Sequence, residues 1–287
     1  MNPENKILAC VDRSPCADHV TDCAAWAARR MDAPLELLHV IERHPEIGSG
    51  RDHSGSIGVN SQEALLTELS EQDAAFTRNA REQGRVFLNR LRGRAIAAGA
   101  PQVDVRQRHG ALEETLVEQE DAVSLIVLGR RGESAATAQR DLGRNVERVV
   151  RALHRPILSV TDSFREPKRV LIAFDGSGTT RRGIELVARS PLFAGVPIHL
   201  LMSGKERPDG PKDIEWARRA LEGGGHEVHA AIVPGDPEQV IARHAAEDGI
   251  DLLVMGAYGH SPLRSLLFGS KTSDLLRIAS IPTLLLR

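Results

Sequence analysis

Short apolar runs alternate with longer amphipathic stretches along most of the chain. Runs such as Leu125–Gly129 (LIVLG) and Leu252–Gly256 (LLVMG) are apolar throughout, which is typical of parallel strands that helices cover on both faces. The stretches between the runs carry apolar residues at helical spacing. Strands that alternate with helices in this way predict a doubly wound α/β sheet.

The same order of elements occurs twice. The segments KILACVD and KRVLIAFD each hold an apolar run that ends in Asp, and the segments RPILSV and IPTLLL each place a proline before a final apolar run. We therefore predict two tandem α/β domains of five parallel strands each, residues 1–162 and 168–287, with the polar stretch 161–168 as the linker. Ligands of such sheets bind beyond the carboxyl ends of the strands.

The two repeats differ after their second strand. The first repeat has a polar loop from Glu42 to about Asn60 and then a helical pattern from Gln62 to Ala98, whereas the second repeat has only a short segment there. We expect the long helix to cover the sheet. A contact with a partner or with the other domain is the alternative.

Bulk composition excludes several classes of protein. The net charge of the 287-residue chain is −2, so it gives no reason to expect nucleic acid or an anionic membrane as a partner. The apolar runs are too short to span a bilayer, and the first residues lack the layout of a signal peptide, so we expect a cytoplasmic protein. The three cysteines, Cys10, Cys16 and Cys23, form no CxxC pair, which argues against a disulfide framework or a thiolate zinc site.

Spacing excludes two common phosphate-binding loops. In GSKT, Lys271 follows Ser270, so the Gly-Lys step of a P-loop is absent. In FDGSGTTRRG the third glycine is Gly183, whereas a dinucleotide fingerprint would need it at 181. The second strand of that repeat also ends without the acidic residue that holds a ribose hydroxyl.

The stretch GAYGHSPLRSLLFGSK combines features that suit a phosphate. Gly256 and Gly259 have no Cβ, so their backbone can approach a ribose or phosphate closely. After nine intervening residues, Gly269 and Ser270 precede a helical pattern, and the amides at a helix N-terminus attract anions. The Ser270 hydroxyl can donate to a phosphate oxygen, and Lys271 adds positive charge.

This spacing, G-2x-G-9x-G-[ST] after the fourth strand, resembles the ATP-binding signature of the universal stress protein family. The strand-Asp-x-Ser start and the proline-led last strand of each repeat fit the same family, and the similarity covers essentially the whole chain. It implies an adenine nucleotide alpha hydrolase-like fold, ATP or ADP as the ligand, and Mg²⁺ beside the phosphates, although no dedicated carboxylate cluster stands out. It also implies that the last strands of the two domains pair, and it leaves a further homodimer open.

The resemblance assigns roles within the C-terminal domain. Asp175 would lie against the adenosine, and the backbone at Met202 and Ser203 would read the adenine edge. The positions that would contact ribose and phosphates are Gly256, Gly259, Gly269, Ser270 and Lys271.

The N-terminal domain carries a weaker copy of this signature. Its matching positions are Asp12, Gly129, Gly132 and Gly143. Ten residues rather than nine separate its second and third glycines, Arg144 replaces the serine, and Asp141 adds negative charge. The arginines Arg130, Arg131 and Arg140 would compensate for that charge. We therefore expect the C-terminal domain to hold the nucleotide.

Groups placed for catalysis do not stand out. His260 lies in the glycine loop, but the sequence shows no Ser-His-Asp order, metal triad or paired carboxylates. We therefore expect an ATP-binding protein of the stress response with at most weak ATPase activity. The alternatives are a nucleotide hydrolase with true turnover and a scaffold that does not use nucleotide.

Overall fold

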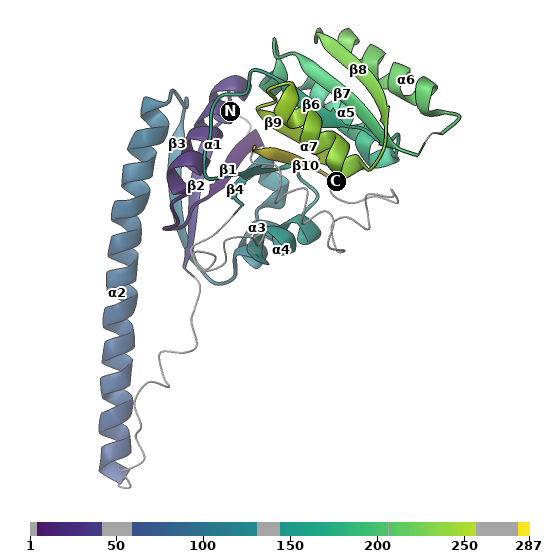
Figure 1. The fold of residues 1–287 in the computed structure, drawn as a ribbon. Helices are drawn as coiled ribbons and strands as arrows, with labels where there is room; N and C mark the ends of the chain where they lie inside the picture. Colours follow the sequence, from purple (N-terminus) through teal and green to yellow (C-terminus); the bar gives the residue numbers. More distant parts are fainter. Residues whose placement is uncertain (1–4, 42–58, 131–143, 206, 257–280) are drawn as a thin grey trace.

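The computed structural model describes residues 5–41, 59–130, 144–205, 207–256 and 281–287 (Figure 1). The first repeat comprises β1 (Lys6–Cys10), α1 (Ala17–Met31), β2 (Leu35–Ile41), α2 (Val59–Ala97), β3 (Val103–His109), α3 (Leu112–Val117), η3 (Glu120–Ala122), β4 (Val123–Gly129), α4 (Arg144–Ala152) and β5 (Ile157–Val160). The second comprises β6 (Val170–Ala173), α5 (Gly178–Arg189), η5 (Pro191–Phe193), β7 (Ile198–Gly204), α6 (Gly210–Gly223), β8 (Val228–Pro234), α7 (Pro237–Glu247), β9 (Leu252–Gly256) and β10 (Thr283–Leu286). The α/β class predicted from the sequence is confirmed.

All ten strands belong to one sheet, in the order β3-β2-β1-β4-β5-β10-β9-β6-β7-β8. Neighbouring strands are parallel within each half, and the halves join through the antiparallel pair of β5 and β10, where Leu158 lies opposite Leu284. The pairing of last strands that the family resemblance implied is therefore present. Because this one pair is antiparallel, the carboxyl ends of the strands point to opposite edges of the sheet in the two halves.

Each face of the sheet has its own apolar core. Successive side chains of a strand point to opposite faces, so Val170 and Ile172 of β6 pack on one face and Leu171 and Ala173 on the other. Helices α1, α2, α5 and α6 cover the first face, and α3, α4 and α7 cover the second. Burial on both faces explains why central strands such as β6 and β9 are apolar along almost their whole length.

The long helix α2 packs beside β3, the outer strand of the first half of the sheet, and extends well beyond the sheet (Figure 1). Its last third presents a buried stripe to the sheet and to α1, formed by Gly84, Leu88, Leu91 and Ala95. The expected covering role is confirmed for this part of the helix.

The stretch predicted as a linker packs against α1. The ring of Phe164 lies 5.9 Å from that of Trp26, and Glu166 forms a 2.6 Å ion pair with Arg29. Arg30, the next residue of α1, donates to the carbonyls of the η5 region in the second half. The segment between the halves is thus part of the packed structure.

Two neighbouring glycines at the end of α6 give a matched test of packing. A Cβ at Gly224 would overlap the backbone carbonyl of Ala188, whereas a Cβ at Gly223 would meet nothing within 4 Å. We expect Gly224→Ala to lower the free energy of unfolding by about 1–3 kcal/mol, since backbone cannot move aside as a side chain can. Gly223→Ala should be neutral or should stabilise by up to ~1 kcal/mol. Urea denaturation measures both, and equal effects would refute the steric explanation.

Candidate functional site

Three strand ends meet at one edge of the C-terminal half. Strand β6 lies between β9 and β7, and all three run parallel. Asp175 follows shortly after the end of β6, Met202 and Ser203 lie near the end of β7, and Gly256 is the last residue of β9. The structure therefore brings together four of the residues that the sequence assigned to a ligand.

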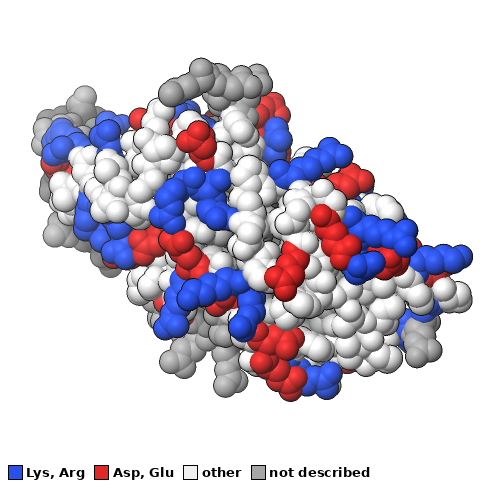
Figure 2. Space-filling model, turned by 90° about the horizontal axis from the view of Figure 1, so that it is seen from above, with Lys and Arg blue, Asp and Glu red and all other residues white. Residues whose placement is uncertain are grey.

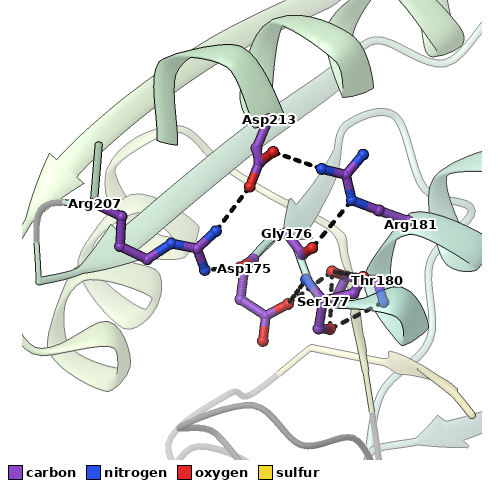
Figure 3. Close-up of polar contacts among 7 residues, drawn as sticks. All are labelled: Asp175, Gly176, Ser177, Thr180, Arg181, Arg207 and Asp213. Carbon is purple, nitrogen blue, oxygen red and sulfur yellow. Dashed lines mark hydrogen bonds and ion pairs between the residues drawn. The ribbon is translucent and has the colours of Figure 1, made fainter. Parts of the chain in front are cut away.

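A tight turn fixes Asp175 at the start of α5 (Figure 3). Its Oδ1 accepts hydrogen bonds from the backbone N–H of Ser177 at 2.9 Å and from the Thr180 hydroxyl at 2.7 Å. The Ser177 hydroxyl in turn accepts from the Thr180 N–H and caps the helix. The strand-Asp-x-Ser pattern thus produces a carboxylate held at a helix N-terminus.

Gly256 approaches the first turn of α5 closely. A Cβ at this position would lie 3.3 Å from the Thr180 methyl carbon and 3.4 Å from that of Thr179. A larger residue would press on these two threonine side chains. Gly256 therefore packs directly on the first turn of α5, which places the end of β9 next to the N-terminus of the helix that follows Asp175.

An ion-pair bridge lies beside this turn, and we define it as the Asp213 bridge (Figure 3). Asp213 of α6 accepts from Arg181 at 2.5 Å through Oδ1 and from Arg207 at 2.7 Å through Oδ2. The same arginines donate to the carbonyls of Gly176 and Asp175, at 3.1 and 2.6 Å. Sequence reasoning missed this bridge, because Arg181 and Asp213 are 32 positions apart and follow no motif.

The N-terminal half repeats the turn but not its surroundings. Oδ1 of Asp12 accepts from the Ser14 N–H at 3.0 Å, as in the second half. Cys16 at the N-cap of α1 makes no side-chain cap hydrogen bond, and Arg13, which replaces Gly176, binds Gln83 at 2.9 Å. Gly129 ends β4 as expected. The two turns are therefore similar in backbone and different in chemistry.

Arg130, which the sequence suggested as a compensating charge, contacts the other half of the protein. Its side chain is only 7% exposed, and its guanidinium donates to the carbonyl of Ile281 and the hydroxyl of Thr283, both at 3.0 Å. It therefore ties the end of β4 to the start of β10 in the other half. The compensating role at a phosphate stays a prediction, and the structure shows Nη2 of Arg130 bound to residues of the other half.

We expect Arg130→Met to lower the free energy of unfolding by about 2–3 kcal/mol, because it removes two hydrogen bonds from a buried charged group. Arg108→Met changes an exposed arginine of β3 and should stay within about 0.5 kcal/mol of the wild type. Chemical denaturation of both variants measures the difference. Equal stability of the two variants would show that the contacts of Arg130 carry no net energy.

Several assigned residues lie outside the described part of the chain. These are Gly132, Gly143, Gly259, Gly269, Ser270 and Lys271. Among the described residues, no three His, Cys, Asp or Glu side chains are placed to hold a metal ion. No helix in the described ranges has the length and apolar character needed to cross a bilayer.

Charged side chains of both signs are interspersed on the face shown in Figure 2. Many charged side chains of the described residues pair with one of opposite sign, as Arg94 does with Asp22 at 2.6 Å and Arg218 with Glu215 at 2.8 Å. The hydrogen bonds from Arg218 and Arg219 lower the pKa of Glu215 to about 2. On the described part of this face, charge is thus balanced locally instead of forming a patch of one sign.

The three cysteines are buried and are not joined in a disulfide, and the Cys16 thiol donates to Oδ1 of Asp162 at 3.0 Å. Burial, with smaller contributions from Asp12 and Glu36, raises the pKa of the Cys10 thiol to about 12. Such a thiol stays protonated at neutral pH and behaves as a core residue, as the sequence indicated for Cys10.

The fold and the site define a doubly wound α/β protein of two repeats, with a candidate ligand site beyond the strand ends. Comparison with known sequences gives the family: the profile of the universal stress protein family matches residues 4–161 and 202–287. Universal stress protein Slr1230 of Synechocystis is 33% identical over 284 residues, which cover 98% of this chain and 99% of that protein. The chain belongs to the universal stress protein family.

A solved structure of similar extent has the same fold. A universal stress protein from Archaeoglobus fulgidus aligns with 100% of this chain and 97% of its own, with a TM-score of 0.69 and 20% identity. A universal stress protein family protein from Arabidopsis thaliana, solved with AMP bound, aligns with 42% of this chain and 90% of its own at 20% identity and a TM-score of 0.33.

Proposed function

We propose that this protein binds an adenine nucleotide, ATP or ADP, and acts in the stress response or its regulation. The nucleotide is held mainly by the second repeat, in a domain spanning residues 168–287. One observation carries the proposal: the Asp175 turn, the end of β7 and Gly256 meet at a single strand edge beside the N-terminus of α5. Family membership supports the class of ligand.

The described residues fit the adenosine end of such a ligand. The carboxylate of Asp175 is fixed in place, the backbone at Met202 and Ser203 lies near the end of a largely buried strand, and Gly256 packs on the first turn of α5. The phosphate end is assigned from the sequence alone, to Gly259, Gly269, Ser270 and Lys271. Mg²⁺ would accompany the phosphates there.

The first repeat is proposed as the weaker site. It keeps Asp12 and Gly129 in the equivalent places, with Gly132 and Gly143 assigned by sequence. Arg13 stands where the second repeat has a glycine, and Arg130 is bound to the other half. These differences support an unequal pair of sites.

The test is to release ligands from the purified full chain and identify them by mass spectrometry, and then to titrate ATP, ADP and GTP in a thermal-shift assay. ATP at 100 times its dissociation constant should stabilise the fold by about 2.7 kcal/mol, and GTP should do so much less. Absence of both a nucleotide peak and a thermal shift would refute the proposal. Steady ATP turnover well above background would instead favour a hydrolase.

A further inference from the structure

The Asp213 bridge uses both oxygens of a nearly buried carboxylate. The side chain of Asp213 is 13% exposed, whereas those of Arg181 and Arg207 are 36% and 46% exposed. The carboxylate is therefore the fixed centre of the bridge, and the two guanidiniums are oriented by it. Charge-assisted hydrogen bonds between arginine and carboxylate are strong and fix the relative geometry of the two groups.

The two arginines transmit that orientation to the backbone of the site. Arg207 donates to the carbonyl of Asp175, and Arg181 donates to that of Gly176. Gly176 has a φ of 75°, and a Cβ there would come within 2.5 Å of the Asp213 carboxylate. The bridge thus packs directly on the turn whose carboxylate faces the proposed nucleotide.

Arg181 is further held by an aromatic surface. Its guanidinium lies 4.7 Å from the ring centroid of Trp216, and that ring stacks on Phe174 at 6.4 Å. Phe174 directly precedes Asp175 at the end of β6. The contacts of Trp216 with Arg181 and Phe174 therefore join α6 to α5 and to this strand end. Arg207 brings in the loop that follows Ser203, so the bridge spans two of the strand ends that form the proposed site.

In the described part of the first repeat, no carboxylate takes the place of Asp213. Gly99 and Gly225 occupy equivalent places after α2 and α6, both with a φ of 86°. Phe87 lies as many positions before Gly99 as Asp213 lies before Gly225, so Phe87 is the equivalent of Asp213 in the first repeat. A phenyl ring cannot accept from two arginines. The bridge therefore distinguishes the repeat that we propose to bind nucleotide from the one that we propose to bind it weakly.

We propose that Asp213 is a positioning residue of the nucleotide site. It holds Arg181 and Arg207 on the carbonyls of the Asp175 turn and so sets the distance between that turn and the end of β7, where the adenosine is held. This inference rests on the proposed function. It adds a residue that does not touch the ligand and that the glycine signature does not contain.

The test compares Asp213→Asn with Asp18→Asn in the full chain. Asp18 is a matched control because it also joins two arginines, Arg90 at 2.7 Å and Arg94 at 3.2 Å, but these lie between α1 and α2. Titration calorimetry should show ATP binding about tenfold weaker in Asp213→Asn, as expected for the loss of one good charge-assisted hydrogen bond. Asp18→Asn should bind ATP as the wild type does.

A second readout needs no nucleotide. The Ser177 amide donates to Asp175, so its hydrogen exchange should accelerate in Asp213→Asn and stay unchanged in Asp18→Asn. If Asp213→Asn folds poorly, Arg207→Gln is the substitute, because it changes a more exposed residue. It should also weaken ATP binding and accelerate hydrogen exchange at Ser177. Unchanged ATP affinity and unchanged exchange at Ser177 would overturn the inference while leaving the proposed function intact. A wild type that binds no ATP would overturn the proposed function, and the exchange data would then decide whether Asp213 positions the turn.

Discussion

Leu284→Asp should unfold both halves of the protein together. Leu284 is 1% exposed, lies opposite Leu158 in the antiparallel pair of β10 and β5, and contributes to the core that runs through both halves. A carboxylate at this position would have no partner of opposite charge from the strands that flank it, which are apolar there. Burying an unpaired charge costs several kcal/mol, and a typical domain has only about 5–15 kcal/mol of stability in total.

Ile232→Asp provides the control for this experiment. It makes the same chemical change in β8, an outer strand of the sheet, at a side chain that is 42% exposed. We expect its free energy of unfolding to stay within about 1 kcal/mol of the wild type. Circular dichroism with urea denaturation compares the two. A transition that persists in Leu284→Asp with about half the amplitude would show that the halves fold independently.

The sequence predicted the elements that depend on local pattern. Apolar runs such as Leu252–Gly256 identify buried parallel strands, because both faces of such strands must be covered. The repeated Asp-x-Ser identified two turns that the structure shows with matching hydrogen bonds, from Ser14 to Asp12 and from Ser177 to Asp175. These features are encoded within a few residues of one another, so they can be found without the fold.

The contacts between distant segments could not be predicted in this way. The sequence suggested Arg130 as a charge that compensates for Asp141, and gave no hint that it binds Ile281 and Thr283, more than 150 positions away. Asp213 lies in an ordinary amphipathic helix, and its partners Arg181 and Arg207 are two among many arginines. Only the order of strands in the sheet brings such groups together.

The pairing of helices shows how two repeats of one fold diverge. In the first repeat Asp18 of α1 binds Arg90 of α2, whereas in the second Arg181 of α5 lies over Trp216 of α6. Both contacts join the same two helix positions on the same face of the sheet. The fold tolerates either contact, because the buried apolar residues of these helices provide the packing against the sheet. The side chains on the helix surface near each turn can therefore differ between the repeats.

Gly256→Val should abolish measurable nucleotide binding, with a loss of affinity of about 100-fold or more, equivalent to about 2.7 kcal/mol. The Cβ alone would lie 3.3 Å from the Thr180 methyl carbon, so the two further methyl groups of valine must push β9 and the start of α5 apart. That displacement would separate Gly256 from the Asp175 turn, on which the proposed site depends. Gly256→Ala, which needs a shift of only a few tenths of an ångström, should give an intermediate loss.

Gly129→Val is the matched change in the first repeat, since Gly129 ends β4 as Gly256 ends β9. Calorimetric titration with ATP on the three variants and the wild type separates the two sites. If the second repeat holds the nucleotide, Gly129→Val retains most of the affinity and Gly256→Val does not. The reverse result would move the site to the other edge of the sheet, because the antiparallel pair of β5 and β10 places the two strand ends at opposite edges. A ligand at one glycine therefore cannot contact the other, and the two substitutions report on separate sites.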